Sequence, residues 1–248
     1  MKFATKMKTA SIIIIGNEIL SGRTQDTNSN YLAKMLVERG ISLEEVRVIP
    51  DDHTIIKSVV KNEASTKDYV FTSGGIGPTH DDITAEAIAN CFDIPLTIRD
   101  DAVELLAMNY KNGRKDLNSA RLRMARIPES AKLIKNKISG APGFIINNVF
   151  VMAGVPQIFE AMVQEIISDL GSVNPILSKA IKVFKTESEI SDRLWNYADK
   201  YKDISIGSYP FNSSGEFGVE IVLRHTDPVL LDKVFNEISR DFNEPNTS

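Results

Sequence analysis

The stretch at residues 73–84 contains the residue types that bind phosphate in many α/β proteins. Gly74, Gly75 and Gly77 stand directly after the short apolar run of residues 69–71, which predicts a buried strand. Glycine accepts positive φ angles and lets a ligand approach the backbone closely. A strand, a glycine-rich turn and the N-terminus of a helix together receive phosphate or another anion. We therefore expect an anion-binding loop here.

Two adjacent carboxylates, Asp81 and Asp82, follow these glycines, and two interpretations of them are open. Either residue, or Thr79, could cap the helix that the apolar residues after position 82 predict. Alternatively, the carboxylates hold a divalent cation beside a phosphate, since two negative charges would repel a phosphate that arrives alone. The neighbouring glycines favour the second interpretation.

A second set of polar residues follows the four isoleucines at positions 12–15. Such a β-branched run is typical of a central parallel strand that is covered on both faces. It ends at a glycine, and Asn17 and Glu18 come next, so their side chains should lie at the carboxyl edge of the sheet, where ligands bind. Further along, Asp26 and Asn28 begin a predicted helix, and helix capping is the simpler role for both.

The order of the predicted elements defines the fold class. Strands alternate with helices three times between residues 12 and 91, which predicts a three-layer α/β domain with a mostly parallel sheet. Residues 100–126 are predicted to be helical with a break near position 112, and a hairpin turning at Asn147 and Asn148 follows. The helical segment carries the densest positive cluster, which could neutralise a polyphosphate: Arg114, Lys115, Arg121, Arg123 and Arg126.

Residues 171–175 form the best candidate for a linker. A β-α-β-β-α pattern follows within residues 179–242 and is typical of a small α+β unit. We therefore divide the chain into a domain at residues 1–172 and a smaller α+β domain at residues 173–248. Trp195 is expected to face the core of the second domain.

The composition excludes several classes of protein. The 248 residues are 42% hydrophobic and 25% charged, which is ordinary for a globular chain. A net charge of −4, without a Lys/Arg block, argues against a nucleic-acid partner. Cys91 is the only cysteine, so an internal disulfide is impossible and a core role is expected. No apolar run could span a membrane and no signal-peptide pattern is present, so we expect a cytoplasmic protein.

Four ordered motifs resemble the molybdopterin-binding (MoCF, MoaB/Mog-like) domain family, in the branch found in CinA proteins and at the N-terminus of FAD synthases. The first is Gly-Asn-Glu-Ile-Leu-Ser-Gly at residues 16–22 with Asp-Thr-Asn at 26–28, and the second is residues 73–84. The others are Ala-Pro-Gly at 141–143 and Gly-Val-Pro at 154–156. The resemblance implies a MoaB/Mog-type α/β fold followed by the smaller CinA-type α+β domain.

The resemblance also implies a small phosphorylated ligand. In this branch the domain is associated with metal-dependent hydrolysis of nucleotide diphosphates such as ADP-ribose or FAD, and in the wider family with molybdopterin binding. A non-catalytic nucleotide-binding module is a third alternative, because Asn17 stands where many members have Asp. Two further departures are Arg-Met-Ala at residues 123–125, in place of Lys-Gln-Ala, and Ser-Gly at 139–140, in place of Gly-Thr.

We therefore expect a nucleotide-diphosphate hydrolase that uses a divalent metal ion, with a pterin as the alternative ligand and a homo-oligomer as the assembly. Nucleic acid and membranes are not expected partners. Asp81, Asp82 and Glu18 are the predicted catalytic residues, and Asp82 and Glu18 the predicted metal ligands. The predicted substrate-binding residues come from the four motifs and the arginine-rich segment: Gly16, Asn17, Asp26, Asn28, Ser73, Gly74, Gly75, Gly77, Pro78, Thr79, Thr84, Arg123, Gly140, Pro142 and Gly143.

Overall fold

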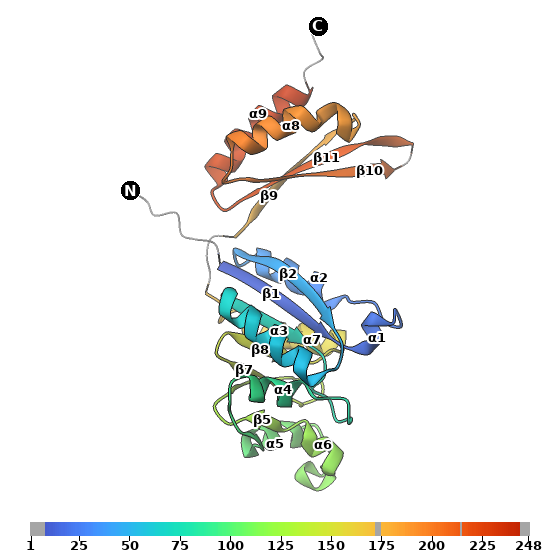
Figure 1. Cartoon of the computed structure of the whole chain (residues 1–248), viewed down its shortest axis with the longest axis vertical. Coiled ribbons are helices and arrows are strands. Elements are labelled where there is room, and N and C mark those ends of the chain that lie inside the picture. The colour runs from blue at the N-terminus through green and yellow to red at the C-terminus, as the bar shows by residue number, and fades with distance from the viewer. Residues whose placement is uncertain (1–7, 172–174, 214, 244–248) are drawn as a thin grey trace, which may run out of the picture. The chain divides into compact units, whose positions relative to one another are not determined.

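The computed structural model describes residues 8–171, 175–213 and 215–243 (Figure 1). The chain divides into two compact units, Met1–Val173 and Asn174–Ser248. The predicted linker at residues 171–175 falls mostly on residues 172–174, which lie outside the described ranges. Each unit is therefore described by itself.

A six-stranded sheet forms the centre of the first unit. Its strand order is β2-β1-β3-β8-β7-β6, with parallel pairing from β2 to β8 and antiparallel pairing beyond. The strands are β1 (Lys8–Ile15), β2 (Ile41–Ile49), β3 (Tyr69–Ser73), β6 (Lys132–Ile134), β7 (Gly143–Ile146) and β8 (Val149–Met152). The interior position of β1 confirms the prediction from its four isoleucines.

Helices cover both faces of this sheet and make three layers. Helices α2 (Asn28–Val37) and α7 (Pro156–Ile166) pack on one face, and α3 (His53–Thr66) and α4 (Thr84–Cys91) pack on the other. The side chains of β1 alternate between the two cores: Ile13 and Ile15 enter one, and Ile12 and Ile14 enter the other. The three-layer, mostly parallel fold is thus confirmed.

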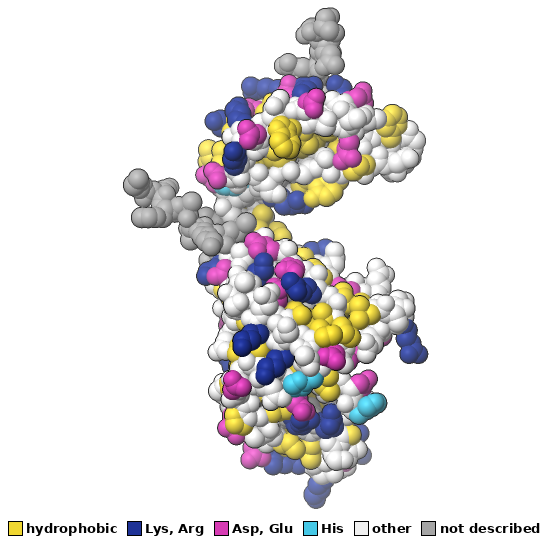
Figure 2. Space-filling view, in the orientation of Figure 1, with side chains coloured by type: hydrophobic (Ala, Val, Ile, Leu, Met, Phe, Trp, Pro, Cys, Tyr) yellow, Lys and Arg dark blue, Asp and Glu magenta, His cyan; other side chains and the backbone are white. Residues whose placement is uncertain are grey.

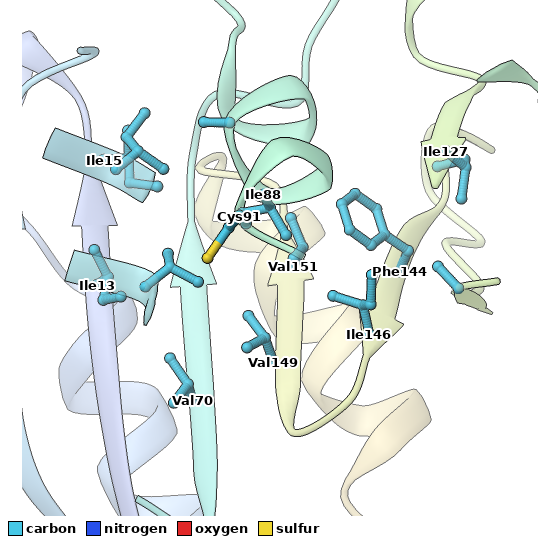
Figure 3. Close-up of a cluster of buried hydrophobic side chains, with 14 of the residues drawn as sticks. Ile13, Ile15, Val70, Ile88, Cys91, Ile127, Phe144, Ile146, Val149 and Val151 are labelled. Carbon is cyan, nitrogen blue, oxygen red and sulfur yellow. The ribbon is translucent and has the colours of Figure 1, made fainter. Parts of the chain in front are cut away.

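The core beneath α3 and α4 joins the strands to the helices (Figure 3). Val70 of β3, Val149 and Val151 of β8 and Phe144 of β7 form a continuous apolar floor. Cys91 lies at the end of α4 and is 7% exposed within this cluster, which confirms its predicted core role. Burial raises the pKa of the Cys91 thiol.

Residues 100–126 differ from the single broken helix that the sequence predicts. They form α5 (Asp100–Ala107), the 3₁₀ helix η1 (Gly113–Asp116) and the short α6 (Ser119–Arg123), and then enter a strand. That strand, β5 (Arg126–Pro128), pairs with β4 (Leu96–Ile98) in a separate two-stranded sheet. Strand pairing outweighs helix propensity at the end of this segment, because local propensity is a weak prior against tertiary contacts.

The hairpin between β7 and β8 turns where it is predicted to turn. Asn147 has a φ of 52°, a conformation that Asn adopts more readily than most residues and that two-residue hairpin turns require. The Asn148 side chain donates hydrogen bonds to the backbone oxygens of Ala64 and Lys67, at 3.0 and 2.9 Å. These bonds tie the hairpin to the end of α3.

The second unit has the predicted β-α-β-β-α order. It consists of β9 (Leu177–Val183), α8 (Glu187–Lys200), β10 (Ser205–Ser213), β11 (Glu216–His225) and α9 (Pro228–Asn243), with antiparallel strand order β10-β11-β9. Its core includes Ile190, Ile221 and Ile238. The prediction for Trp195 is wrong: its side chain is 74% exposed, because α8 turns Ile190 toward the sheet instead.

Charged side chains of both signs are mixed over the visible face of each unit (Figure 2). No helix among the described residues combines the length and the apolar character needed to cross a bilayer.

Candidate functional site

A cavity of about 510 Å³ lies at the carboxyl edge of the sheet in the first unit. All four parallel strands contribute to it: Ile15 ends β1, Asp51 follows β2, Gly74 follows β3 and Ala153 follows β8. Ligands of open α/β folds bind at this edge. The full lining is Ile15, Glu18, Thr24, Asp51, Gly74, Gly75, Ile76, Gly77, Pro78, Asp81, Asp82, Met124, Asn136, Ser139, Ala141, Ala153, Gly154, Val155, Pro156 and Ile158.

The loop after β3 can be built only with glycine at two positions. Gly74 has a φ of 112°, and a Cβ there would lie 2.1 Å from the backbone oxygen of Ile15. Gly75 has a φ of 69°, and a Cβ there would lie 2.0 Å from the Thr84 hydroxyl. At these two glycines the loop therefore presses its backbone against β1 and α4, while Ile76 and Pro78 of the same loop line the cavity.

Thr84 supports this loop from beneath. Its backbone N–H donates to the Gly75 carbonyl at 3.0 Å. Its side chain is fully buried, and its hydroxyl has no hydrogen-bond partner among the described residues. Thr84 thus belongs to the supporting structure and does not line the cavity.

The acidic pair does not cap α4, so the capping interpretation is wrong. The residue that caps α4 is Ile83, without any side-chain hydrogen bond. Instead, Asp82 accepts hydrogen bonds from the Thr79 N–H at 2.7 Å and from the Thr79 hydroxyl at 2.6 Å, and Asp81 accepts from the same hydroxyl. The hydrogen bond from Thr79 lowers the pKa of Asp81. Both carboxylates line the cavity.

Glu18 reaches the cavity from the short helix α1 (Asn17–Leu20), which begins directly after β1. Its carboxylate folds back over Gly16, where a Cβ would lie 2.5 Å from Oε1. The Asn17 backbone N–H donates to Asp51 Oδ2 at 2.9 Å, and this bond holds the Asp51 carboxylate at the cavity wall.

Asp26 and Asn28 form a smaller cavity of about 40 Å³ that shares Glu18 and Gly154 with the large one. The N-cap residue of α2 is Thr27, without a side-chain hydrogen bond, and Asp26 lies one residue earlier, where it accepts from the backbone N–H of Asn28 at 2.9 Å. Asn28 is not a cap. Its buried side chain donates to Ser73 Oγ and to the Gly154 carbonyl, both at 2.8 Å, and so ties the ends of β3 and β8 together.

Arg123 and Pro142 line a third, very small cavity, the side pocket, together with Gly77 and Asp82. Gly140 and Gly143 serve packing instead. A Cβ at Gly140 would lie 2.9 Å from the Leu105 carbonyl, and one at Gly143 would lie 2.3 Å from the Val151 carbonyl.

The structure thus brings seven of the predicted site residues to the large cavity: Glu18, Gly74, Gly75, Gly77, Pro78, Asp81 and Asp82. Asp26, Asn28, Ser73, Arg123 and Pro142 line the two smaller cavities beside it. The remaining predicted residues line none of these three described cavities: Gly16, Asn17, Thr79, Thr84, Gly140 and Gly143.

Several lining residues were not predicted from the sequence. Asn136 is 6% exposed and shapes the loop before β7 by donating to Ser139 Oγ at 2.6 Å. Met124 and Ile158 supply apolar wall. Ala141, Gly154, Val155 and Pro156 belong to the third and fourth motifs, whereas Asp51, Asn136 and Ile158 lie outside all four.

The carboxylates do not form a metal site of their own. Among the residues the structure describes, no three His, Cys, Asp or Glu side chains converge into a metal-binding group. The predicted ligands Asp82 and Glu18 line one cavity but leave most of a coordination shell unfilled. A divalent ion therefore stays a prediction, and one that would need oxygen atoms from the ligand.

Fold and site together define an α/β ligand-binding domain of the MoaB/Mog type. Residues 11–176 match the family described as a probable molybdopterin binding domain, and residues 175–246 match the middle domain of FAD synthase. The first match covers well over half of the chain, and the protein belongs to the molybdopterin-binding domain family. This finding confirms the resemblance drawn from the four motifs.

Three relatives show how far this similarity extends along the chain. A protein of Archaeoglobus fulgidus is 37% identical over 80% of this chain and 84% of its own length. The crystal structure of CinA from Thermoplasma acidophilum is 37% identical, covers 65% of this chain and 97% of that chain, and has a TM-score of 0.61. A probable FAD synthase of Caenorhabditis elegans is 33% identical over 82% of this chain, which spans only 44% of that relative's length.

Proposed function

We propose that the large cavity binds a pterin or a nucleotide that carries phosphate. The observation that carries this proposal is the cavity itself, which joins a glycine-rich turn to an apolar wall at the carboxyl edge of the sheet. Its volume of about 510 Å³ lies within the range of small-molecule sites. The membership of the molybdopterin-binding family and the similarity to FAD synthase support both ligand classes.

The apolar wall suits a fused aromatic ring. Ile76, Met124 and Ile158 offer surface against which a ring can pack, and Asn136 and Ser139 supply polar edges beside it. Pterins and guanine-type bases present neighbouring N–H groups, and a carboxylate accepts two such donors at once. One of the four lining carboxylates would then serve as the partner of the ring edge.

The glycine turn suits the phosphate of the same ligand. Backbone N–H groups of an uncovered turn bind anionic oxygens at short range. Asp81 and Asp82 repel that phosphate unless a cation comes with it. A Mg²⁺ ion bound to the phosphate would satisfy this requirement, because Mg²⁺ typically uses one or two protein carboxylates together with phosphate oxygens.

The second candidate function is hydrolysis of a diphosphate. The observation that favours it is the presence of four carboxylates, Glu18, Asp51, Asp81 and Asp82, around one cavity. One of them would accept a proton from the attacking water as the water oxygen bonds to phosphorus and the P–O–P bridge opens. General-base catalysis of this kind contributes about 10²–10⁴-fold.

One experiment tests both candidates. Calorimetric titrations with a pterin, FMN, FAD and ADP-ribose, each with and without Mg²⁺ or Mn²⁺, measure binding, and chromatography of the incubated mixtures measures cleavage. Binding without cleavage supports the first candidate alone, and metal-dependent release of mononucleotides supports the second. If no ligand binds under any of these conditions, the proposed function is wrong.

A further inference from the structure

Of the four arginines at positions 114, 121, 123 and 126, one has a guanidinium without a partner among the residues that the structure describes. Arg114 pairs with Glu104 at 2.6 Å, and Arg126 pairs with Glu86 at 2.9 Å. Arg121 packs over the Tyr110 ring and donates to the Asp116 carbonyl. Arg123 has no hydrogen bond or ion pair to any described residue, and its Nε is buried without a partner.

The position of Arg123 is as informative as its lack of partners. It lines the side pocket, whose wall of Ile76, Gly77, Asp82 and Met124 is shared with the large cavity. The side pocket has room for about 10 Å³, which is at most one water molecule. A ligand cannot enter it, so Arg123 can meet a ligand only by extending past this shared wall into the large cavity.

We propose that Arg123 is the residue that distinguishes a phosphorylated ligand from its unphosphorylated form. This inference rests on the proposed function of the large cavity. A buried N–H donor without a partner is unfavourable, and a phosphate would satisfy Nε and a terminal nitrogen together through paired, charge-assisted hydrogen bonds. The same contact places a positive charge between the phosphate and Asp82, and so reduces the repulsion that Asp82 otherwise exerts.

Arg126 provides a matched control within the same pocket. It also lines the side pocket and carries the same charge, but its guanidinium is already bound to Glu86. If only the local positive charge mattered, loss of either arginine would weaken phosphate binding equally. If the uncommitted donors matter, only Arg123 should show the effect.

The experiment compares two matched ligand pairs, riboflavin with FMN and adenosine with AMP, by calorimetry. Wild type, Arg123→Gln, Arg123→Lys and Arg126→Gln are titrated with each compound. We expect wild type to prefer the phosphorylated member by about tenfold or more, which corresponds to one hydrogen bond to a charged group. In Arg123→Gln, the ratio of the affinities for the phosphorylated and unphosphorylated compounds should fall close to one, while the affinity for riboflavin and adenosine stays the same. Arg123→Lys should keep part of the wild-type ratio, and Arg126→Gln should keep most of it.

The outcomes separate this inference from the proposed function. An unchanged FMN preference in Arg123→Gln overturns the inference and leaves ligand binding intact. Equal losses in Arg123→Gln and Arg126→Gln also overturn it, in favour of a general charge effect. If none of the four compounds binds wild type, pyrophosphate alone is tested by thermal shift. Stabilisation of wild type but not of Arg123→Gln would support the role of Arg123 in phosphate binding and argue against a binding site for the ring. If pyrophosphate does not stabilise wild type, both the inference and the proposed function are wrong.

Discussion

Replacement of Gly75 by alanine should destabilise the first unit through two separable effects. The first is conformational: a φ of 69° is unfavourable for any residue with a Cβ, by about 1–2 kcal/mol. The second is steric: the new Cβ would lie 2.0 Å from the Thr84 hydroxyl and 3.0 Å from Thr84 Cβ. Forcing a methyl group into a packed site costs about 1–3 kcal/mol. We therefore expect a total loss of about 2–5 kcal/mol.

Gly113 provides the control for the conformational part. Its φ is 60°, yet a Cβ there would meet nothing within 4 Å, so Gly113→Ala should lose only about 1–2 kcal/mol. The difference between the two variants isolates the contact with Thr84. The double variant Gly75→Ala/Thr84→Ala should recover part of that difference, because it removes the hydroxyl that the methyl group strikes.

The single cysteine makes this measurement specific to the first unit. Cys91 is buried in the core of that unit, so the rate of thiol labelling across a urea series reports when this core opens. A loss in Gly75→Ala no greater than in Gly113→Ala would refute the steric reasoning. The closeness of Thr84 also implies that the branched side chain of Gly75→Val would cost more stability than alanine.

Four further predictions concern the same region. If the diphosphate is cleaved, Asp82→Asn should reduce turnover by orders of magnitude and more than Asp81→Asn, measured as product released per enzyme; near-normal turnover in both would remove the acidic pair from the chemistry. The hydrogen bond from Thr79 lowers the pKa of Asp81 in the folded protein, so this bond stabilises the fold above the pKa of the unfolded chain, and the stabilisation is lost as pH falls through the lower pKa of the folded state. Thr79→Val should therefore raise the pKa of Asp81 in an NMR titration. An unchanged pKa would show that the hydrogen bond from Thr79 is not the cause of the shift. Asn28→Ala breaks one buried and one part-buried hydrogen bond, both at 2.8 Å, and should lower the free energy of unfolding by about 2–6 kcal/mol, whereas a loss below 1 kcal/mol would show that water replaces them. In the native protein, Cys91 should react with a thiol reagent at pH 8 far more slowly than after unfolding, since burial raises its pKa; equal rates would contradict its core position.

The sheet could be predicted from the sequence because its signals are local. Four consecutive isoleucines fix β1 as an interior strand, and an Asn pair between apolar runs fixes the β7–β8 turn. The glycine loop was also predictable, since its sequence carries the backbone requirement directly. In each case one short segment contains the whole physical reason for its structure.

The predictions that failed depend on contacts between segments that are distant in the sequence. The interpretation of Asp81 and Asp82 as caps failed because α4 starts only at Thr84, and this start is set by the contact with Gly75, nine residues earlier. The long helix at residues 100–126 failed because Arg126 enters a strand that pairs with residues 96–98. Asn136 and Ile158 reach the cavity only through the tertiary fold, and neither belongs to one of the four motifs.

The charges around the cavity limit which ligands can bind there. Glu18, Asp51, Asp81 and Asp82 lie around a glycine-rich turn between a strand and a helix, an arrangement that favours an anion. The carboxylates favour a cation or N–H donors, and the turn favours an anion. One ligand can satisfy both only if it carries N–H donors at one end and a negative charge at the other, or if a cation binds with it. A ring with N–H donors joined to a phosphate meets the first condition, and a metal-bound diphosphate meets the second. The guanidinium of Arg123 would help in either case, because it lines the side pocket beside Asp82 and pairs with no described carboxylate. The dependence of binding on added Mg²⁺ therefore separates the two ligand classes: Mg²⁺ should strengthen the binding of a phosphorylated pterin or a mononucleotide, and a diphosphate should require it.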